Sequence, residues 1–325
     1  MKNMRKFTLI ITLLACFTGR AGDLNEASLK QQIDLLSHLK NSVTRFDSVN
    51  DFEAPIETLT TNQQIILQYL WLDVLANQTH LNEAQFRWIK ALTETGLVLR
   101  GSLLDHPNSE VTLINILESA KSALRLIDIN QQEQEFERRW QNHDLDWTLW
   151  LAPQSNHYHG FINWLKMQTV EEYAQLSSQW LKLGVVQTLP DNNALLIILT
   201  KLPSIELANQ LLSREVDQYT RQFIQRLPSL PLYYDGVQLL AIGLDKPALS
   251  SQTLVTLAKH YDHQHQAQDL LLSALDSDQH KWHVMAVLEK ISDNGFRQRL
   301  NKRFASDSSK FAQSAMKQLS KGDLQ

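Results

Sequence analysis

Five histidines near the end of the chain are of the residue type that binds transition metals. They are His260, His263, His265, His280 and His283. Neutral imidazoles, together with Asp262 between the first two, are competent ligands for Zn²⁺ or Cu²⁺. Their spacing matches no established zinc motif such as His-Glu-x-x-His, and histidines in a turn rich in Gln and Asp are equally typical of a solvated turn. The sequence therefore assigns no metal site and leaves a metal-binding protein open as an alternative.

No residue pattern indicates a catalytic site. The sequence has no Gly-x-Ser-x-Gly motif for a nucleophilic serine, and no glycine-rich loop is followed by the Lys-Ser/Thr pair of a phosphate-binding loop. Lytic transglycosylases include helical envelope proteins, and Glu118 would be the candidate acid in that family. The Gly-Leu-Met-Gln-like segment that should follow it is absent. We therefore expect a protein that is not an enzyme and has no cofactor.

The tryptophans are unevenly distributed along the chain. Five of the eight fall within residues 140–180, around a stretch with the composition of a loop, LAPQSNHYHG, at 151–160. We expect a connecting segment at 151–189 between two helical units. The rings either fill a core between helices or stack on sugars. Stacking on sugars would make the chain an accessory protein of cell-wall (peptidoglycan) enzymes, and this alternative stays open.

The composition predicts helices. Only 10 of 325 residues are glycine, about 3% against a usual value of roughly 7%, and tight β-turns need glycine. Apolar residues recur at spacings of three and four, as on one face of a helix. Residues 29–46 are expected to form one helix of about six turns, and a further helix is expected from Ser109 through Ile127. We predict an all-α fold whose N-terminal part, 24–150, is a helical bundle.

The last third of the chain has the pattern of a series of short antiparallel helices. The expected helices span 191–202, 204–215, 217–227, 232–244, 250–261, 264–275, 279–291, 295–305 and 308–319. Several follow an Asp or Ser, as N-caps require, and the connections are short. Each helix pair would bury its apolar face only against neighbouring pairs.

One part of this series resembles a known repeat. The residues LLSALDSD at 271–278, followed by Trp282, His283, Ala286 and Ile291, resemble a HEAT repeat of the type with about 30 residues. The resemblance lies mainly in residues 267–320. His283 replaces the usual Arg, and Glu289 replaces the usual Gly. The resemblance implies an α-α solenoid, a HEAT-like superhelix, at 190–320.

The N-terminus has the pattern of an export signal. Three basic residues precede nine apolar or small residues at 7–15, too few to span a bilayer, which takes about 20 residues. The sole cysteine, Cys16, follows Leu-Leu-Ala, a sequence that resembles a bacterial lipobox. This resemblance implies cleavage after residue 15 and acyl chains on Cys16, and Phe17 at the next position implies transfer to the outer membrane. Cleavage after residue 21 would instead give a soluble periplasmic protein.

The net charge of the chain limits the kinds of partner that it can bind. Removal of residues 1–15 takes away three positive charges and lowers the formal net charge from −4 to −7. An acidic protein is a poor ligand for nucleic acid, so we expect no nucleic-acid partner. The sequence predicts an exported scaffold that binds an envelope protein or peptide, with contact to the membrane through a lipid anchor on Cys16.

Overall fold

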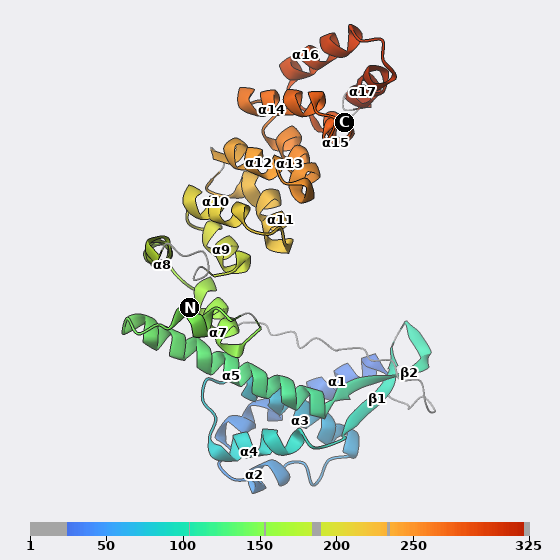
Figure 1. Cartoon of the computed structure of the whole chain (residues 1–325). Coiled ribbons are helices and arrows are strands. Elements are labelled where there is room, and N and C mark those ends of the chain that lie inside the picture. Colours follow the sequence, from blue (N-terminus) through green and yellow to red (C-terminus); the bar gives the residue numbers. More distant parts are fainter. Residues whose placement is uncertain (1–24, 104, 153, 184–189, 233–234, 322–325) are drawn as a thin grey trace. The chain divides into compact units, whose positions relative to one another are not determined.

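The structure, a computed structural model, describes residues 25–103, 105–152, 154–183, 190–232 and 235–321. Within these residues it contains seventeen α-helices and one two-stranded sheet (Figure 1). The chain divides into two compact units, Met1–Trp164 and Leu165–Gln325, and each is described by itself. The division lies in the segment 151–189 for which the sequence predicts a connection. The predominantly helical character expected from the sequence is confirmed.

The first unit consists of helices around one hairpin. Its elements are α1 (Glu26–Leu36), a 3₁₀ helix η1 (Ser37–Arg45), α2 (Asn50–Glu53), α3 (Thr61–Ala76), α4 (Glu83–Leu92), β1 (Val98–Leu103), β2 (His106–Asn115), α5 (Ile116–Gln141), α6 (Trp147–Trp150) and most of α7 (Asn156–Lys166). A hydrophobic core joins α1, α3, α4, the hairpin and the first half of α5. The rings of Phe46, Phe52, Trp71 and Trp88 lie within it, with centroids 4.5 to 6.0 Å apart.

The single helix expected over residues 29–46 is wrong in its second half, where the chain forms η1. Polar side chains there bond to backbone carbonyls of their own turn: Ser42 Oγ donates to Leu39 O at 2.6 Å, and Thr44 Oγ1 donates to Asn41 O at 2.9 Å. Such local bonds compete with the α-helical pattern. Trp71 then anchors the segment, because its Nε1 donates to Leu39 O at 3.1 Å.

The sheet is a departure from the purely α-helical prediction. Residues 109–115 lie in β2, so the helix expected to begin at Ser109 begins instead at Ile116. β1 pairs with β2 in antiparallel register, with Gly101 opposite Val111. Val111 and Leu113 are buried while Thr112 between them is half-buried, which is the alternation that a half-buried strand requires. The short run of β-branched residues favours the strand locally.

A second aromatic cluster lies where α6 and α7 pack on the end of α5. Phe136 contacts Trp150, Phe161 and Trp164, with ring centroids 4.6 to 5.0 Å apart. The close approach of α7 requires Gly160, because a Cβ there would lie 2.7 Å from Glu133 N on α5. Gly160 therefore belongs to a helix. The loop expected at 151–160 is shorter than predicted, because α7 begins at Asn156.

The second unit is helical throughout its described residues. After α8 (Val170–Leu183) come α9 (Asn192–Leu199), α10 (Ile205–Ser213), α11 (Gln218–Arg226), η2 (Leu227–Ser229), α12 (Gly236–Leu244), α13 (Pro247–His260), α14 (His265–Asp276), α15 (Lys281–Val287), η4 (Leu288–Lys290), α16 (Asn294–Ala305) and α17 (Lys310–Lys321). We call α9–α17 the helix array.

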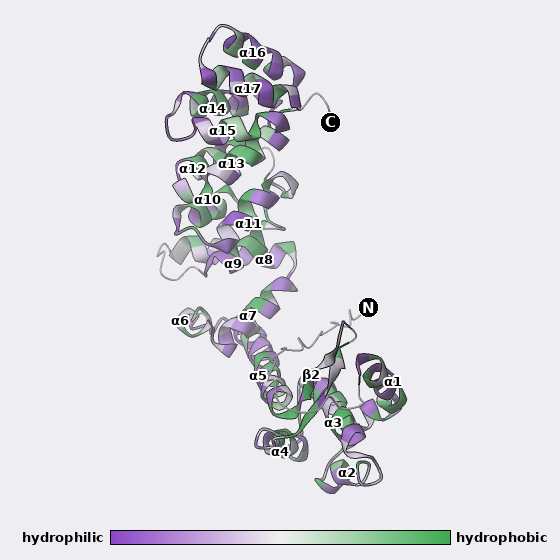
Figure 2. Cartoon of the chain, turned by 90° about the vertical axis from the view of Figure 1, so that its right-hand side faces the viewer, coloured by the Kyte–Doolittle hydropathy of each residue, from purple (hydrophilic) through white to green (hydrophobic). Residues whose placement is uncertain are grey.

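Contacts in the helix array follow a regular rule. The odd-numbered helices touch in succession: α9 contacts α11, α11 contacts α13, α13 contacts α15, and α15 contacts α17. The even-numbered helices α10, α12 and α14 do the same. Apolar residues gather where α10, α12 and α13 meet (Figure 2). Each helix thus buries its apolar face against near neighbours in the sequence.

Side-chain caps define where several helices of the array begin. Asp191, Asp217 and Asp293 each accept a hydrogen bond from a backbone N–H of the first turn that follows. Such caps satisfy N–H groups that have no partner within the helix. In the described part of the chain, no helix combines the length and the apolar character needed to cross a membrane.

Candidate binding pocket

The five histidines singled out in the sequence do not form a cluster. His263, His265 and His283 are exposed, while His260 and His280 are half-buried. Burial lowers the pKa of His260, the Lys259 charge adds to this, and Asp262 opposes it. Within the described residues, no three His, Cys, Asp or Glu side chains are placed so that they could hold a metal ion. The fold therefore gives no geometric support to the metal-binding alternative.

Asp262, the acidic residue of that sequence cluster, has a structural role instead. Its side chain is 3% exposed. Oδ2 accepts hydrogen bonds from Ser292 N, from Ser292 Oγ at 3.0 Å and from Asp293 N at 2.8 Å. These bonds attach the turn after α13 to the segment that begins α16. Oδ2 is thus engaged by three donors, while Oδ1 lies 3.9 Å from His263 Nδ1.

Glu118 and Cys16 are the two other residues that the sequence singles out. Glu118 lies in the first turn of α5, exposed, with Oε1 at 3.1 Å from Lys121 Nζ; this is a surface ion pair of neighbouring helical turns. Cys16 and the export signal lie outside the described residues.

The Trp-rich segment is mostly core. Trp150 and Trp180 are fully buried, Trp164 is 3% exposed and Trp140 is 8% exposed. Trp147 is half-buried beside Phe136, with ring centroids 6.1 Å apart. These rings pack against protein and leave no broad aromatic face for a sugar. Packing is thus the role that the structure gives to the Trp-rich segment.

The exposed indole is Trp282, on α15, with 58% of its surface accessible. It borders a cavity of about 370 Å³ in the last part of the helix array. The lining comes from α14, α15, α16, the connection after α16 and α17: Leu275, Asp276, Lys281, Trp282, Arg303, Phe304, Asp307 and Phe311. Trp282 belongs to the stretch of sequence that resembles a HEAT repeat, and that resemblance does not single out this pocket.

Short-range capping places the pocket residues. Asp293 Oδ1 accepts from Phe296 N at 2.7 Å and begins α16, the helix that carries Arg303 and Phe304. Asp307 Oδ1 accepts from Ser309 N at 2.8 Å, and Ser309 Oγ accepts from Ala312 N at 3.1 Å. These two bonds fix the turn that leads into α17 and so fix Phe311. The pocket is therefore built on regular elements with defined starts.

Three aromatic rings form the apolar part of the pocket. Trp282 meets Phe311 edge to face, with centroids 5.3 Å apart and an interplanar angle of 83°. Phe311 in turn lies 6.3 Å from Phe304, which is 3% exposed. Edge-to-face pairs of this kind are favourable beyond their buried area. The arrangement holds the Trp282 ring at the rim while its outer surface remains open.

Ion pairs surround the rings. Arg303 Nη2 pairs with Asp276 Oδ1, and Lys281 Nζ lies 2.6 Å from Asp278 Oδ1. The hydrogen bond from Lys281 lowers the pKa of Asp278. The pocket thus has an apolar floor and a charged, hydrogen-bonding rim. That combination suits recognition of a side chain that is apolar at its tip and polar around it.

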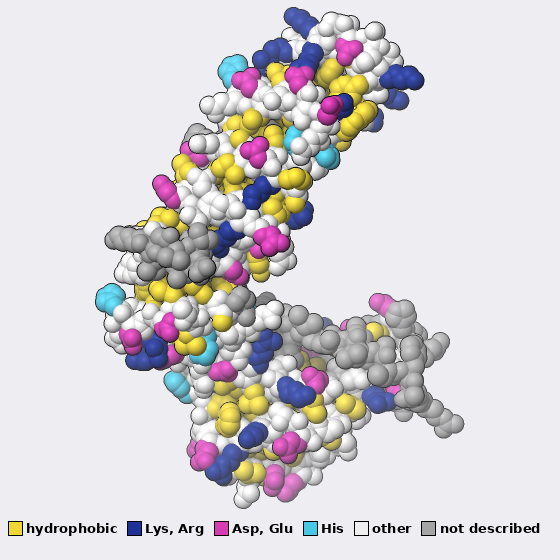
Figure 3. Space-filling view, viewed as in Figure 1, with side chains coloured by type: hydrophobic (Ala, Val, Ile, Leu, Met, Phe, Trp, Pro, Cys, Tyr) yellow, Lys and Arg dark blue, Asp and Glu magenta, His cyan; other side chains and the backbone are white. Residues whose placement is uncertain are grey.

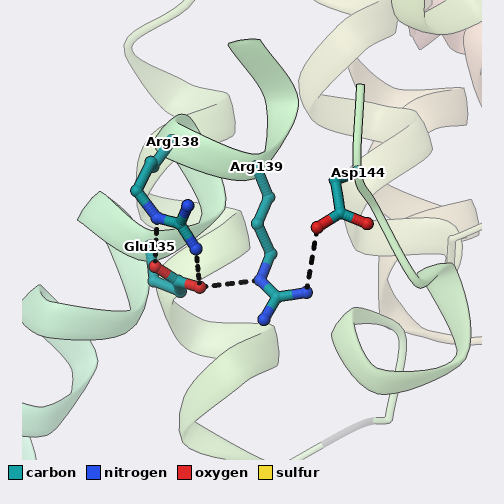
Figure 4. A network of polar contacts seen from close by, with 4 residues as sticks. All are labelled: Glu135, Arg138, Arg139 and Asp144. Atoms are coloured by element: carbon teal, nitrogen blue, oxygen red, sulfur yellow. Dashed lines mark hydrogen bonds and ion pairs between the residues drawn. The ribbon is translucent and has the colours of Figure 1, made fainter. Parts of the chain in front are cut away.

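A polar network in the first unit is structural. Glu135 accepts from Arg138 Nε at 2.8 Å, Arg138 Nη2 at 2.7 Å and Arg139 Nε at 2.7 Å, and Arg139 Nη1 lies 3.9 Å from Asp144 Oδ2 (Figure 4). The hydrogen bonds from the two arginines lower the pKa of Glu135 to about 2. The network joins the end of α5 to the connection before α6, and it presents no free acid or base.

A second hollow, beside α8, is lined only by apolar and hydroxyl side chains. Its residues are Ala174, Ser177, Ser178, Leu181, Leu202, Pro203 and Ser204, and its volume is about 460 Å³. It contains no charged or titratable group. The pocket at Trp282 is therefore the better candidate for specific recognition.

Comparison with known proteins adds no assignment. No protein-family model, no curated protein and no solved structure matches the chain.

Proposed function

We propose that this chain is a non-enzymatic scaffold of the bacterial cell envelope that binds a protein or peptide through a HEAT-like solenoid. The supporting observation is the contact pattern of the helix array, in which the odd-numbered helices α9 to α17 touch in succession and the even-numbered helices α10, α12 and α14 do the same. In a solenoid, each repeat contacts only its neighbours and the stack exposes a continuous surface for partners. The proposed solenoid comprises residues 190–320, preceded by the helical part at 24–150.

Polar bonds between successive helix pairs support the same proposal. Gln252 Nε2 donates to Arg221 O, 31 residues away, and Asp262 accepts from Ser292, 30 residues away. Lys246 Nζ donates to Arg214 O, 32 residues away. A repeat of about 30 residues brings equivalent positions of adjacent pairs together at this separation. The bonds have the period that stacked helix pairs require.

The character of the exposed pocket favours binding over catalysis. It offers aromatic rings and paired charges, and the carboxylates of Asp276 and Asp278 are each engaged by a cation. A catalytic site needs an acid, base or nucleophile placed to reach a substrate. Aromatic rings with a charged rim are instead common where a polypeptide is recognised.

Export and lipid attachment complete the proposal. We take Cys16 as the residue that carries the lipid and so holds the body at the outer membrane, facing the periplasm. The support is the sequence LLAC after a short basic and apolar segment. If Cys16→Ser leaves the protein in the membrane fraction at unchanged mass, the lipid anchor is wrong and the scaffold proposal remains.

Affinity capture tests the scaffold itself. The full chain and a chain ending at residue 189 are used as baits on the same solubilised envelope. The truncated bait keeps the aromatic cluster around Phe136, so its tryptophan emission verifies that the first unit is folded. We expect the full chain to retain a polypeptide that the truncated chain does not. Equal retention by both baits would contradict the proposal.

A further inference from the structure

Positive charge is concentrated at the end of the helix array. The helices α16 and α17 carry seven Lys or Arg residues and no Asp or Glu: Arg297, Arg299, Lys302, Arg303, Lys310, Lys317 and Lys321. Residues 16–325 carry a formal net charge of −7, so the remainder outside these two helices carries −14. Lys and Arg side chains accordingly gather over this end of the second unit (Figure 3).

Some of these charges hold the fold and others face solvent without a partner. Arg297 is buried and donates to the carbonyls of Ile291 and Leu319, and Arg303 pairs with Asp276. Lys302, Lys310 and Lys317 are exposed, and none of their side chains forms an ion pair or hydrogen bond with the described residues. The exposed lysines are thus the charges available to a ligand.

Two of the exposed lysines are direct sequence neighbours of residues that line the aromatic pocket. Lys302 precedes the lining residue Arg303, and Lys310 precedes the lining residue Phe311. Lys310 and Lys317 are seven residues apart on α17, which places them on one face of the helix. A ligand with one group in the pocket and negative charges on either side of that group would meet both features.

We propose that this end of the array binds an acidic peptide segment that inserts one large apolar side chain against Trp282 and Phe311. The inference rests on the scaffold function proposed above and names the chemistry of its partner. The apolar side chain supplies contact area in the pocket, and Asp or Glu residues around it face Lys302, Lys310 and Lys317. Opposite charges steer such a segment to this end and away from the acidic remainder of the chain.

A peptide fits this surface better than a bilayer. The aromatic rings line a cavity, whereas insertion into a bilayer needs apolar groups that protrude. Asp276 and Asp307 lie in the pocket lining, so the cavity itself favours an apolar group over an anionic headgroup. An extended acidic peptide can place its apolar side chain between them while its own carboxylates reach the lysines outside the lining.

The test uses the full chain without its export signal and a fluorescein-labelled synthetic peptide of Glu and Asp around one central Phe. Fluorescence anisotropy reports binding. Two further peptides serve as comparisons: one has Ala in place of Phe, and the other has Lys in place of every acidic residue. We expect saturable binding of the acidic Phe peptide, binding at least about tenfold weaker for the Ala peptide, and none for the basic peptide.

Protein variants locate the binding. Trp282→Ala is expected to weaken binding by about tenfold or more, as truncation of a central aromatic does at interfaces. The double variant Lys302→Glu/Lys310→Glu is expected to weaken it similarly and to reduce its salt dependence. Leu35→Ala and Lys90→Glu, on exposed residues of the first unit, are the matched controls and should leave binding unchanged. Circular dichroism verifies that each variant is folded.

Three outcomes would overturn the inference. One is a Kd weaker than about 1 mM for the acidic Phe peptide. Another is binding that both Trp282→Ala and the lysine variant leave unchanged. The third is failure to bind the peptide together with Trp282-dependent binding to anionic phosphatidylglycerol vesicles, which would assign the surface to a membrane. If affinity capture by the full chain still succeeds in these cases, the scaffold function survives and only the partner chemistry is wrong.

Discussion

The Asp262 carboxylate accepts hydrogen bonds from both the backbone N–H and the hydroxyl of Ser292, thirty residues further along the chain. Asp262 ends one helix pair and Ser292 lies just before α16, so the bonds tie adjacent pairs together by their connections. A charged acceptor with amide and hydroxyl donors makes the stronger kind of hydrogen bond. At this turn, adjacent helix pairs of the array are therefore joined by hydrogen bonds as well as by apolar contacts.

Replacement of Asp262 should weaken the end of the array. Asp262→Asn replaces a carboxylate, which only accepts hydrogen bonds, with an amide that also carries a donor NH₂ group. The amide faces the backbone N–H groups of Ser292 and Asp293. We expect a loss of about 1.5–3 kcal/mol, the range for hydrogen bonds to a charged group. Hydrogen exchange of the backbone amides at the start of α16 measures this loss of stability as faster exchange in the variant. Asp278→Asn, at an aspartate whose side chain is 96% exposed, is the control, and equal effects of the two variants would contradict the account.

Gly160 should not tolerate a side chain. A Cβ at this position would lie 2.7 Å from Glu133 N and 2.8 Å from the carbonyl carbon of Gln132, so α7 would have to move away from α5. Overpacking of this kind costs about 1–3 kcal/mol, which exceeds the gain in helix propensity of roughly 1 kcal/mol from Gly→Ala. Urea denaturation followed by tryptophan emission reports the loss.

Gly96→Ala is the matched control for Gly160→Ala, because a Cβ at residue 96 would meet no atom within 4 Å. We expect Gly96→Ala to leave the unfolding midpoint almost unchanged. Stability retained by Gly160→Ala would mean that α5 and α7 do not pack as described.

The Glu135 network should give a pH-dependent contribution to stability. Hydrogen bonds from Arg138 and Arg139 lower the pKa of Glu135 from 4.5 to about 2. A lowered carboxyl pKa stabilises the folded state above the unfolded pKa, and the contribution disappears as pH falls from about 4.5 towards 2. Because the network is solvent-accessible, we expect Glu135→Gln to cost at most about 1 kcal/mol at neutral pH.

Urea titrations at several pH values between neutral and acidic measure this contribution. The difference between the parent and Glu135→Gln should shrink as the solution is acidified. Glu137→Gln, on the exposed residue two positions along α5, should show no such trend. A constant difference at all pH values would show that the arginines do not act on the ionised form of Glu135.

Trp282 should dominate the tryptophan emission that a soluble quencher can reach. It is 58% exposed, whereas Trp71, Trp150 and Trp180 are fully buried. Acrylamide quenching of the parent, Trp282→Phe and Trp147→Phe measures the difference. We expect Trp282→Phe to remove the largest accessible fraction and Trp147→Phe a smaller one, because Trp147 is half-buried. Unchanged quenching in Trp282→Phe would contradict an open pocket rim.

The helices of the array were predictable from the sequence because each carries local signals. Asp191, Asp217 and Ser204 precede apolar stripes and act as N-caps in the structure. The predicted helix at 264–275 corresponds to α14, and the predicted helix at 295–305 corresponds to α16. Capping and periodicity are properties of neighbouring residues, so a single sequence contains them.

Features that depend on distant residues were not predictable. Val111 and Thr112 form a strand because Gly101 and Arg100 of β1 pair with them, and the need for Gly160 arises because α7 packs closely on α5. The pocket draws on four helices, and the exposure of Trp282 depends on what each of them covers. The sequence spacing suggested one site for the five histidines, but no three metal-ligating side chains among the described residues are placed to hold a metal ion.

Photocrosslinking in the native envelope tests the central claim, that the helix array is the part of the chain that binds a polypeptide. A benzophenone amino acid replaces Gln298 on α16 or Gln313 on α17, both exposed, or Leu35 or Phe86 in the first unit as controls. The account predicts light-dependent adducts with a polypeptide from positions 298 and 313, lost when Trp282→Ala is added, and none from 35 and 86. Adducts from only the first-unit positions, or from no position, would contradict it.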